Sequence, residues 1–225
     1  MKKFLFSLIL FFTWQPALFA ELTIEITEGV EGALPIAVVP FSWQGKGAPP
    51  VDIAEVISAD LQRSGRFKSL PREDMLARPT SVDLVEFKDW RALGIENLVI
   101  GQVQAHGAGG YQIQFQLLDV FRGEQLTGYS IPTTAPNLRN TAHRIADLIY
   151  ENLLGVPGAF ATRVAYITST KLADGETSIK LKIADADGYN PETIVTSTEP
   201  LLSPAWSPDG HSIVFTSDRG GRPQI

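Results

Sequence analysis

Cysteine is absent from all 225 residues of the sequence. The chain can therefore contain no disulfide bond, no thiol nucleophile and no cysteine metal ligand, and ordinary hydrophobic cores must stabilise it. The sequence also lacks a Gly-x-Ser-x-Gly elbow, a Walker loop and a Gly-x-Gly-x-x-Gly run after a predicted strand. These absences exclude thiol catalysis and argue against the common hydrolase and nucleotide-binding motifs.

Basic residues are too few for a typical nucleic-acid-binding protein. Lysine and arginine total 19 against 25 aspartates and glutamates, which gives a net charge of −6 at pH 7. Because phosphate neutralisation dominates nucleic-acid binding, we expect no nucleic-acid partner. The hydrophobic content of 44% and a mean hydropathy near zero are typical of a soluble globular protein.

The apolar run at the N-terminus is too short to cross a bilayer. It covers residues 4–12, follows two lysines, and precedes Pro16 and the small residue Ala20. These features predict a secretory signal peptide over residues 1–20, cleaved between Ala20 and Glu21. Without a cysteine near the cleavage site, a lipoprotein is excluded.

Residues 34–156 are predicted to form one α+β domain. Asp52 is suited to cap a helix that stops at Gly65, and residues 42–50 are rich in glycine and proline and read as a loop. The pattern indicates helices packed against a mixed sheet. The expected strands are 36–41, 97–104, 111–120 and 125–131, and the expected helices follow Asp52 and cover 89–93 and 136–154.

Residues 157–225 change to a purely alternating pattern. The segment 164–169 (VAYITS) matches 212–217 (SIVFTS) at an offset of 48 residues, close to the period of about 40–50 residues of β-propeller blades. The run SPAWSPDG at 203–210 predicts a strand and a tight turn, followed by a strand at 211–217. This half of the chain is therefore predicted to be an incomplete β-propeller, with a first blade and part of a second, from a longer protein. The strands expected in the first blade are 164–169, 179–184 and 192–197, with a hairpin turn at 187–190.

Two groups of residues could suggest a metal site. His143, Asp147 and Glu151 lie four residues apart on the expected last helix, but Asp147 falls opposite its apolar stripe, so a solvated face is the favoured interpretation. The segment 185–190 (DADGYN) resembles the start of a calcium loop, yet its glycine stands fourth rather than sixth, which favours a hairpin turn. No catalytic, cofactor-binding or metal-binding residue is therefore predicted.

Other chemically suggestive side chains also have ordinary interpretations. His106 follows a strand at a glycine-rich turn and His211 follows the 207–210 turn, so both are expected to be surface residues. The aromatic residues Tyr166, Trp206 and Phe215 are expected to fill space between blades rather than to bind a ligand.

Several blocks of the sequence resemble the TolB family of Gram-negative envelope proteins. In the α+β half they are ALPIAVVPF (33–41), ADLQRSGRF (59–67), LGIENLVIGQVQ (93–104) and FQLLDVFRGEQL (115–126). The most specific are AHRIADLIYENLLGVPGAFATRVAYI (142–167) and IADADGYNPETI with EPLLSPAWSPDG (183–210). The resemblance covers essentially the whole chain, including the signal peptide.

The resemblance implies an α+β domain followed by a six-bladed β-propeller. It also implies a periplasmic, non-enzymatic adaptor of the Tol–Pal system, which supports outer-membrane integrity and cell division and which colicins exploit for import. In this family TolA binds the mature N-terminal segment and the lipoprotein Pal binds the propeller. No cofactor is implied.

By the resemblance, residues 21–33 form an exposed partner-binding segment. Its apolar residues alternate with polar ones, as in a strand that can add to a partner's sheet. The alternative from the residues alone is that this segment is the first strand of the α+β domain. The implied TolA-binding residues are Glu21, Leu22, Thr23, Ile24, Glu25, Ile26, Thr27, Glu28, Gly29, Val30, Glu31 and Gly32.

Two other functions stay open from the sequence. The propeller could belong to an exported prolyl-oligopeptidase-type serine peptidase whose catalytic domain lies beyond Ile225, or it could be a ligand-sensing propeller. A Gly-x-Ser-x-Gly run downstream would identify the peptidase, whereas the α+β domain upstream disfavours it.

Overall fold

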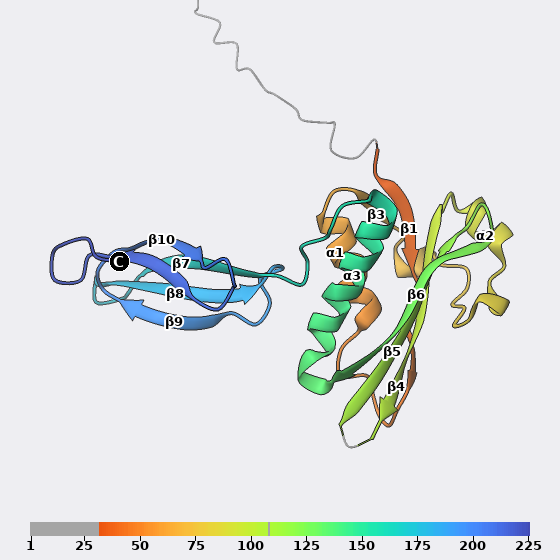
Figure 1. The fold of residues 1–225 in the computed structure, drawn as a ribbon, viewed down its shortest axis with the longest axis horizontal. Helices are drawn as coiled ribbons and strands as arrows, with labels where there is room; N and C mark the ends of the chain where they lie inside the picture. Colours follow the sequence, from red (N-terminus) through yellow and green to blue (C-terminus); the bar gives the residue numbers. More distant parts are fainter. Residues whose placement is uncertain (1–31, 108) are drawn as a thin grey trace, which may run out of the picture.

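The computed structural model describes residues 32–107 and 109–225 (Figure 1). The predicted signal peptide, and all of the predicted TolA-binding segment except Gly32, lie outside the described residues. The first part is a mixed sheet with helices, and the second part consists of antiparallel sheets without helices.

The first sheet has the strand order β3-β1-β4-β5-β6, and β2 also pairs with β4. The pairs β1–β3, β1–β4 and β2–β4 are parallel, whereas β4, β5 and β6 form an antiparallel meander. The sheet is therefore mixed, as the sequence predicts. Its strands are β1 (Leu34–Val38), β2 (Ser42–Gln44), β3 (Phe67–Ser69), β4 (Asn97–His106), β5 (Gly110–Asp119) and β6 (Glu124–Thr134).

Helices α1 (Ile53–Arg63) and α3 (Leu138–Leu154) cover one face of this sheet (Figure 1). Their apolar stripes bury Ile113, Phe115 and Leu117 of β5 in the main core. The short helix α2 (Phe87–Ala92) lies on the opposite face, where buried Trp90 belongs to a second core. Because both faces are covered around β1, its residues are buried on both sides, as its apolar run predicts. Three 3-10 turns complete this part: Arg72–Asp74, Val82–Leu84 and Ala135–Asn137.

Asp52 caps α1, as predicted from the sequence. Its Oδ1 accepts the backbone N–H of Glu55 at 3.1 Å, and its two carboxylate oxygens accept hydrogen bonds from Arg72 at 2.6 and 2.8 Å. The hydrogen bond from Arg72 lowers the pKa of Asp52 below its ordinary value of 3.8, while partial burial of the carboxyl opposes this effect. The charged form of Asp52 is therefore favoured in the folded state.

Lowering the pH should weaken the contact between Asp52 and Arg72. Because the folded-state pKa of Asp52 is lowered, its contribution to stability is present above the ordinary value of 3.8 and is lost as pH falls through the folded-state pKa. The substitution Asp52→Asn keeps a good helix cap but removes the charge, so we expect it to cost roughly 0.5–1 kcal/mol at neutral pH and less in acid. Urea unfolding of both proteins across this pH range measures the difference, and a constant gap at every pH would contradict the assignment.

The second part of the chain contains two antiparallel sheets. Strands β7, β8 and β9 form one sheet, and β10 pairs with β11 in the other. The predicted turn at 207–210 is present, with Gly210 at φ 70° and its N–H bonded to the carbonyl of Ser207. The strands are β7 (Arg163–Lys171), β8 (Thr177–Asp185), β9 (Glu192–Ser197), β10 (Leu201–Trp206) and β11 (Ile213–Ser217).

Most predicted boundaries shift by one to three residues; for example, α2 begins at Phe87 rather than at 89, and β11 begins at Ile213 rather than at 211. Three differences have a clear physical cause. The first strand covers Leu34–Val38 rather than 36–41, because Pro40 has no N–H for a ladder bond. The expected loop at 42–50 begins with the short strand β2. Strand β3, only three residues long, was not predicted, because so short a segment shows no period and is fixed by parallel pairing with β1.

Candidate functional site at the contact between the two parts

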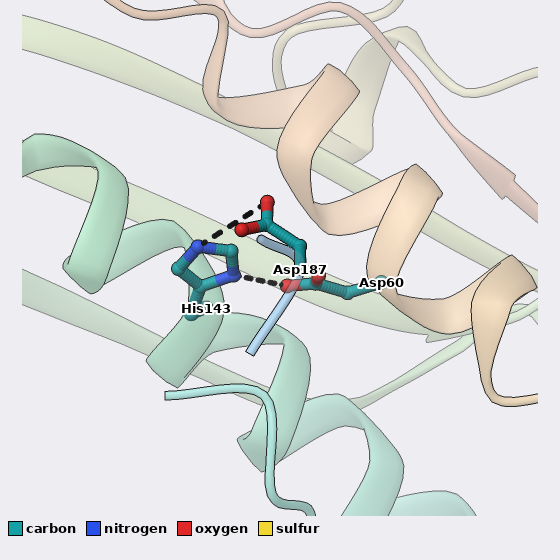
Figure 2. A group of neighbouring side chains, drawn as sticks. All are labelled: Asp60, His143 and Asp187. Atoms are coloured by element: carbon teal, nitrogen blue, oxygen red, sulfur yellow. Dashed lines mark hydrogen bonds and ion pairs between the residues drawn. The ribbon is translucent and has the colours of Figure 1, made fainter. Parts of the chain in front are cut away.

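A buried polar cluster joins the helices of the first part to the first sheet of the second. Asp60 lies on α1, His143 lies on α3, and Asp187 lies in the turn between β8 and β9 (Figure 2). Asp60 and His143 are each only 1% exposed, and the side chain of Asp187 is 7% exposed. We call these three residues, together with Arg139 and Tyr189, the interdomain cluster.

Asp60 and His143 form the inner half of this cluster. Asp60 Oδ2 lies 2.6 Å from His143 Nδ1, and Asp60 Oδ1 accepts a hydrogen bond from Arg63 Nη2. A carboxylate at this position fixes the orientation of the imidazole ring. The ring then directs its other nitrogen, Nε2, toward Asp187 Oδ2 at 3.9 Å, and Nε2 has no hydrogen-bond partner among the described residues.

Asp187 and Arg139 form the outer half. Asp187 Oδ2 pairs with Arg139 Nη2, and Asp187 Oδ1 accepts the backbone N–H of Tyr189 at 2.9 Å. Burial acts to raise the pKa of Asp187, but the Tyr189 N–H and the Arg139 guanidinium outweigh it and hold this pKa below 3.8. The Arg139 guanidinium also stacks over the Tyr189 ring, 4.0 Å from its centroid. The β8–β9 turn is therefore held against α3 by the Asp187–Arg139 ion pair and by the cation–π contact between Arg139 and Tyr189.

The connection between α3 and β7 is also held in place. Asp147 accepts the backbone N–H groups of Phe160 at 2.7 Å and Ala161 at 3.0 Å, and the Phe160 ring packs edge-on against Tyr150 at 5.6 Å. Gly158 passes so close to α3 that an added Cβ would lie 2.8 Å from the Cα atom of Asp147. The connecting segment is therefore bound to the helix that precedes it.

The prediction that His143, Asp147 and Glu151 form a solvated face is wrong for the first two. His143 is buried between α1 and the β8–β9 turn, and Asp147 is covered by the segment that follows α3. Only Glu151 is exposed. Helical periodicity finds the stripe that faces the sheet, but it cannot reveal that a second helix and a second domain cover the flanks of that stripe.

The hairpin turn predicted at 187–190 joins β8 to β9, as expected, with Gly188 at φ 82°. The role of Asp187 in the contact with α3 was not predicted, because its partners His143 and Arg139 lie 44 and 48 positions away along the chain and no local pattern marks them. His106 and His211 are exposed, as predicted. Trp206 is partly buried, with the Arg163 guanidinium 4.9 Å above its ring.

The interdomain cluster has the residue types of a metal site, since single ligand atoms of Asp60, His143 and Asp187 lie within 4.8 Å of one another. Its contacts favour ion pairing instead. Arg63 and Arg139 each bind one of the two carboxylates, so guanidinium groups already supply the positive charge that a cation would supply. The geometry is that of a structural contact between domains.

Two family models match the chain. The TolB amino-terminal domain matches residues 22–126, and the TolB beta propeller domain matches residues 150–225. Within the described part of the chain, no helix is both long and apolar enough to cross a membrane.

The curated relatives that match carry the name Tol-Pal system protein TolB. The protein from Nitrosococcus oceani is 49% identical over 219 residues, which cover 97% of this chain and 50% of that protein. The protein from Thioalkalivibrio sulfidiphilus is also 49% identical, over 96% of this chain and 50% of its own length. The chain thus spans about half the length of the curated relatives it matches.

A solved structure agrees with these matches. The crystal structure of TolB from Acinetobacter baumannii superposes with a TM-score of 0.75 at 35% identity, covering 88% of this chain and 47% of that one. The mixed sheet with helices and the antiparallel sheets that follow it are thus the α+β domain and the beginning of the propeller predicted from the sequence. The chain belongs to the TolB family.

Proposed function

We propose that the protein is a periplasmic, non-enzymatic adaptor of the Tol–Pal system that links TolA to the lipoprotein Pal. The observation that carries this proposal is the similarity over nearly the whole chain to relatives named as Tol-Pal system proteins. Because the chain spans half of those relatives, the partners assigned to the complete protein rest on inference from the family. Export through the predicted signal peptide, and roles in outer-membrane integrity, cell division and colicin import, belong to the same proposal.

The interdomain cluster supports an adaptor in physical terms. An adaptor needs two binding surfaces held in a defined relation, and here Asp187 of the propeller part is paired with Arg139 of α3. The histidine of the cluster is only 1% exposed, so a substrate could not reach its free nitrogen. This arrangement favours a structural role for the cluster over a catalytic one.

Residues 21–32 are proposed to bind TolA by adding a strand to its sheet. In this segment Leu22, Ile24 and Ile26 alternate with polar residues, so one face would present apolar side chains while the main chain supplies hydrogen bonds. The described structure begins at Gly32, just before β1. The proposed segment thus adjoins the α+β domain directly.

Deletion of residues 21–32 tests the proposal. We expect TolA binding to be lost while the melting temperature and Pal binding stay close to those of the parent, measured by isothermal titration calorimetry and thermal unfolding. The single substitution Ile24→Asp should mimic the deletion, because it places a charge on the apolar face of the added strand. A large fall in melting temperature on deletion would instead identify the segment as a structural strand, and unchanged TolA affinity in Ile24→Asp would exclude strand addition.

A further inference from the structure

The sheet face that carries α2 is apolar at one end of its strands and polar at the other. Near α2 this face is apolar, with Leu98 and Ile100 of β4 and Leu118 of β5 in the second core. Farther along the same two strands, the same alternating positions hold glutamines, because side chains two residues apart point to one face. These are Gln102 and Gln104 on β4 and Gln112, Gln114 and Gln116 on β5.

The glutamines form a hydrogen-bonded array across four strands. Gln44 of β2 donates to Gln102 at 3.0 Å, and Gln102 in turn donates to Gln114. Gln116 donates to Gln125 and Gln112 donates to Ser130, each at 2.7 Å. Each primary amide has two donor hydrogens and two acceptor lone pairs, so one bond to a neighbour leaves further capacity unused. The amide nitrogen of Gln114, at the end of the first chain of bonds, donates to no atom within residues 32–107 and 109–225.

Part of this array lines a hollow of about 340 Å³. Its walls come from β4, β5 and β6 and from Thr80, in the segment between the 3-10 turns. At the β6 side, Gly128 lies tightly against β5, because an added Cβ there would lie only 2.9 Å from the carbonyl oxygen of Phe115. Figure 1 shows that α2 and its neighbouring turns lie over one end of the sheet and leave the far ends of β4 and β5 uncovered. We call this hollow the amide groove; its polar side chains are Thr80, Gln102, Gln114, Gln116, Gln125 and Ser130.

The chemistry of the lining indicates the kind of ligand. No charged side chain lines the amide groove, so it offers nothing to neutralise a phosphate or a carboxylate and no anion to hold a cation. Amides and hydroxyls both donate and accept hydrogen bonds, which matches a ligand whose groups do the same. Hydroxyl groups on a sugar ring have this property at every position. The volume also lies within the range of small-ligand sites, about 300–1,000 Å³.

We propose that the amide groove is a binding site for a neutral oligosaccharide. Gln102, Gln114 and Gln116 contribute the central amides, and Ser130 and Thr80 contribute hydroxyls at the two sides. An extended peptide is the less favoured ligand, because peptide recognition on a sheet uses the free backbone groups of an edge strand. The central amides of this hollow, Gln102, Gln114 and Gln116, stand instead on the central strands β4 and β5, and only its β6 side borders a sheet edge. The proposal is independent of the TolA and Pal assignments.

Side-chain amide signals give a direct test. The chain labelled with ¹⁵N is titrated with chitotriose, which is neutral and carries acetamido groups, and separately with maltotriose, which is neutral and carries hydroxyls only. We expect at least one sugar to shift the side-chain NH₂ signals of Gln102, Gln114 and Gln116 with a millimolar dissociation constant. Inorganic phosphate, which finds no cation in the groove, should leave these signals unchanged.

A matched pair of variants separates the groove from general effects. Gln114→Leu keeps a side chain of similar size but removes the free donor, and we expect about tenfold weaker sugar binding from the loss of its hydrogen bonds. Gln62→Leu makes the same chemical change on the exposed side of α1 and should bind like the parent. Absence of shifts with both sugars, equal binding by Gln114→Leu and the parent, or shifts confined to β6 backbone amides would overturn the proposal.

Discussion

Replacing Asp60 with alanine is expected to lower the free energy of unfolding by roughly 1–3 kcal/mol, the usual cost of leaving a buried polar group without its hydrogen-bond partner. The carboxylate is 1% exposed and bonds both His143 Nδ1 and Arg63. Without it, Nδ1 of His143, a residue that is 1% exposed, is buried without a hydrogen-bond partner. Urea unfolding monitored by far-ultraviolet circular dichroism measures the change.

Two further variants show whether the loss comes from the pairing itself. Asp83→Ala removes an exposed carboxylate in a 3-10 turn and should change stability by less than about 0.5 kcal/mol. The double variant Asp60→Leu, His143→Leu removes both buried polar groups, and Arg63, which is 44% exposed, can turn to water. We expect the double variant to be more stable than Asp60→Ala, because an apolar pair leaves no unsatisfied group. A double variant that is less stable than Asp60→Ala would show that packing, not pairing, sets the cost.

The sequence predicted the elements whose patterns are local. Helix α3 shows its stripe of Leu138, Ile145 and Ile149 at helical spacing, and all three are buried. The matching segments at 164–169 and 212–217 lie within or beside β7 and β11, because similar alternation produces similar strands. The cap residue Asp52 was identified because its side chain bonds a residue only three positions away.

The candidate site could not be predicted in the same way. His143 contacts Asp60, 83 positions earlier, and Arg139 contacts Asp187, 48 positions later. On the helical wheel His143 stands beside the apolar stripe rather than in it, so periodicity assigns it to solvent until α1 is placed. A hairpin turn sequence such as 187–190 specifies its own conformation but carries no sign of what its side chains touch. Only the packing of the two parts brings these residues together.

Replacing Asp187 with alanine is expected to loosen the propeller part from the α+β domain while each part stays folded. The Asp187 carboxylate pairs with Arg139 and lies 3.9 Å from His143 Nε2. Its loss leaves the Tyr189 stack as the remaining contact of the β8–β9 turn with Arg139. Since the sequence has no cysteine, spin labels can be placed at Glu151→Cys on α3 and Lys171→Cys on β7 without background labelling. We expect a broader distribution of distances between these labels in the intact protein carrying Asp187→Ala.

The β7–β8 turn provides a matched control for this experiment. Asp174 Oδ1 accepts the backbone N–H of Glu176 at 3.0 Å, just as Asp187 Oδ1 accepts that of Tyr189 at 2.9 Å, yet Asp174 is exposed and makes no hydrogen bond to α1 or α3. Asp174→Ala should therefore leave the label distances narrow. If both variants broaden the distribution equally, weakening of any hairpin turn in this sheet is the cause and the interdomain role of Asp187 is wrong. If neither does, Asp147 and the segment bound to it hold the two parts together without the cluster, because those hydrogen bonds to Phe160 and Ala161 are untouched by either substitution.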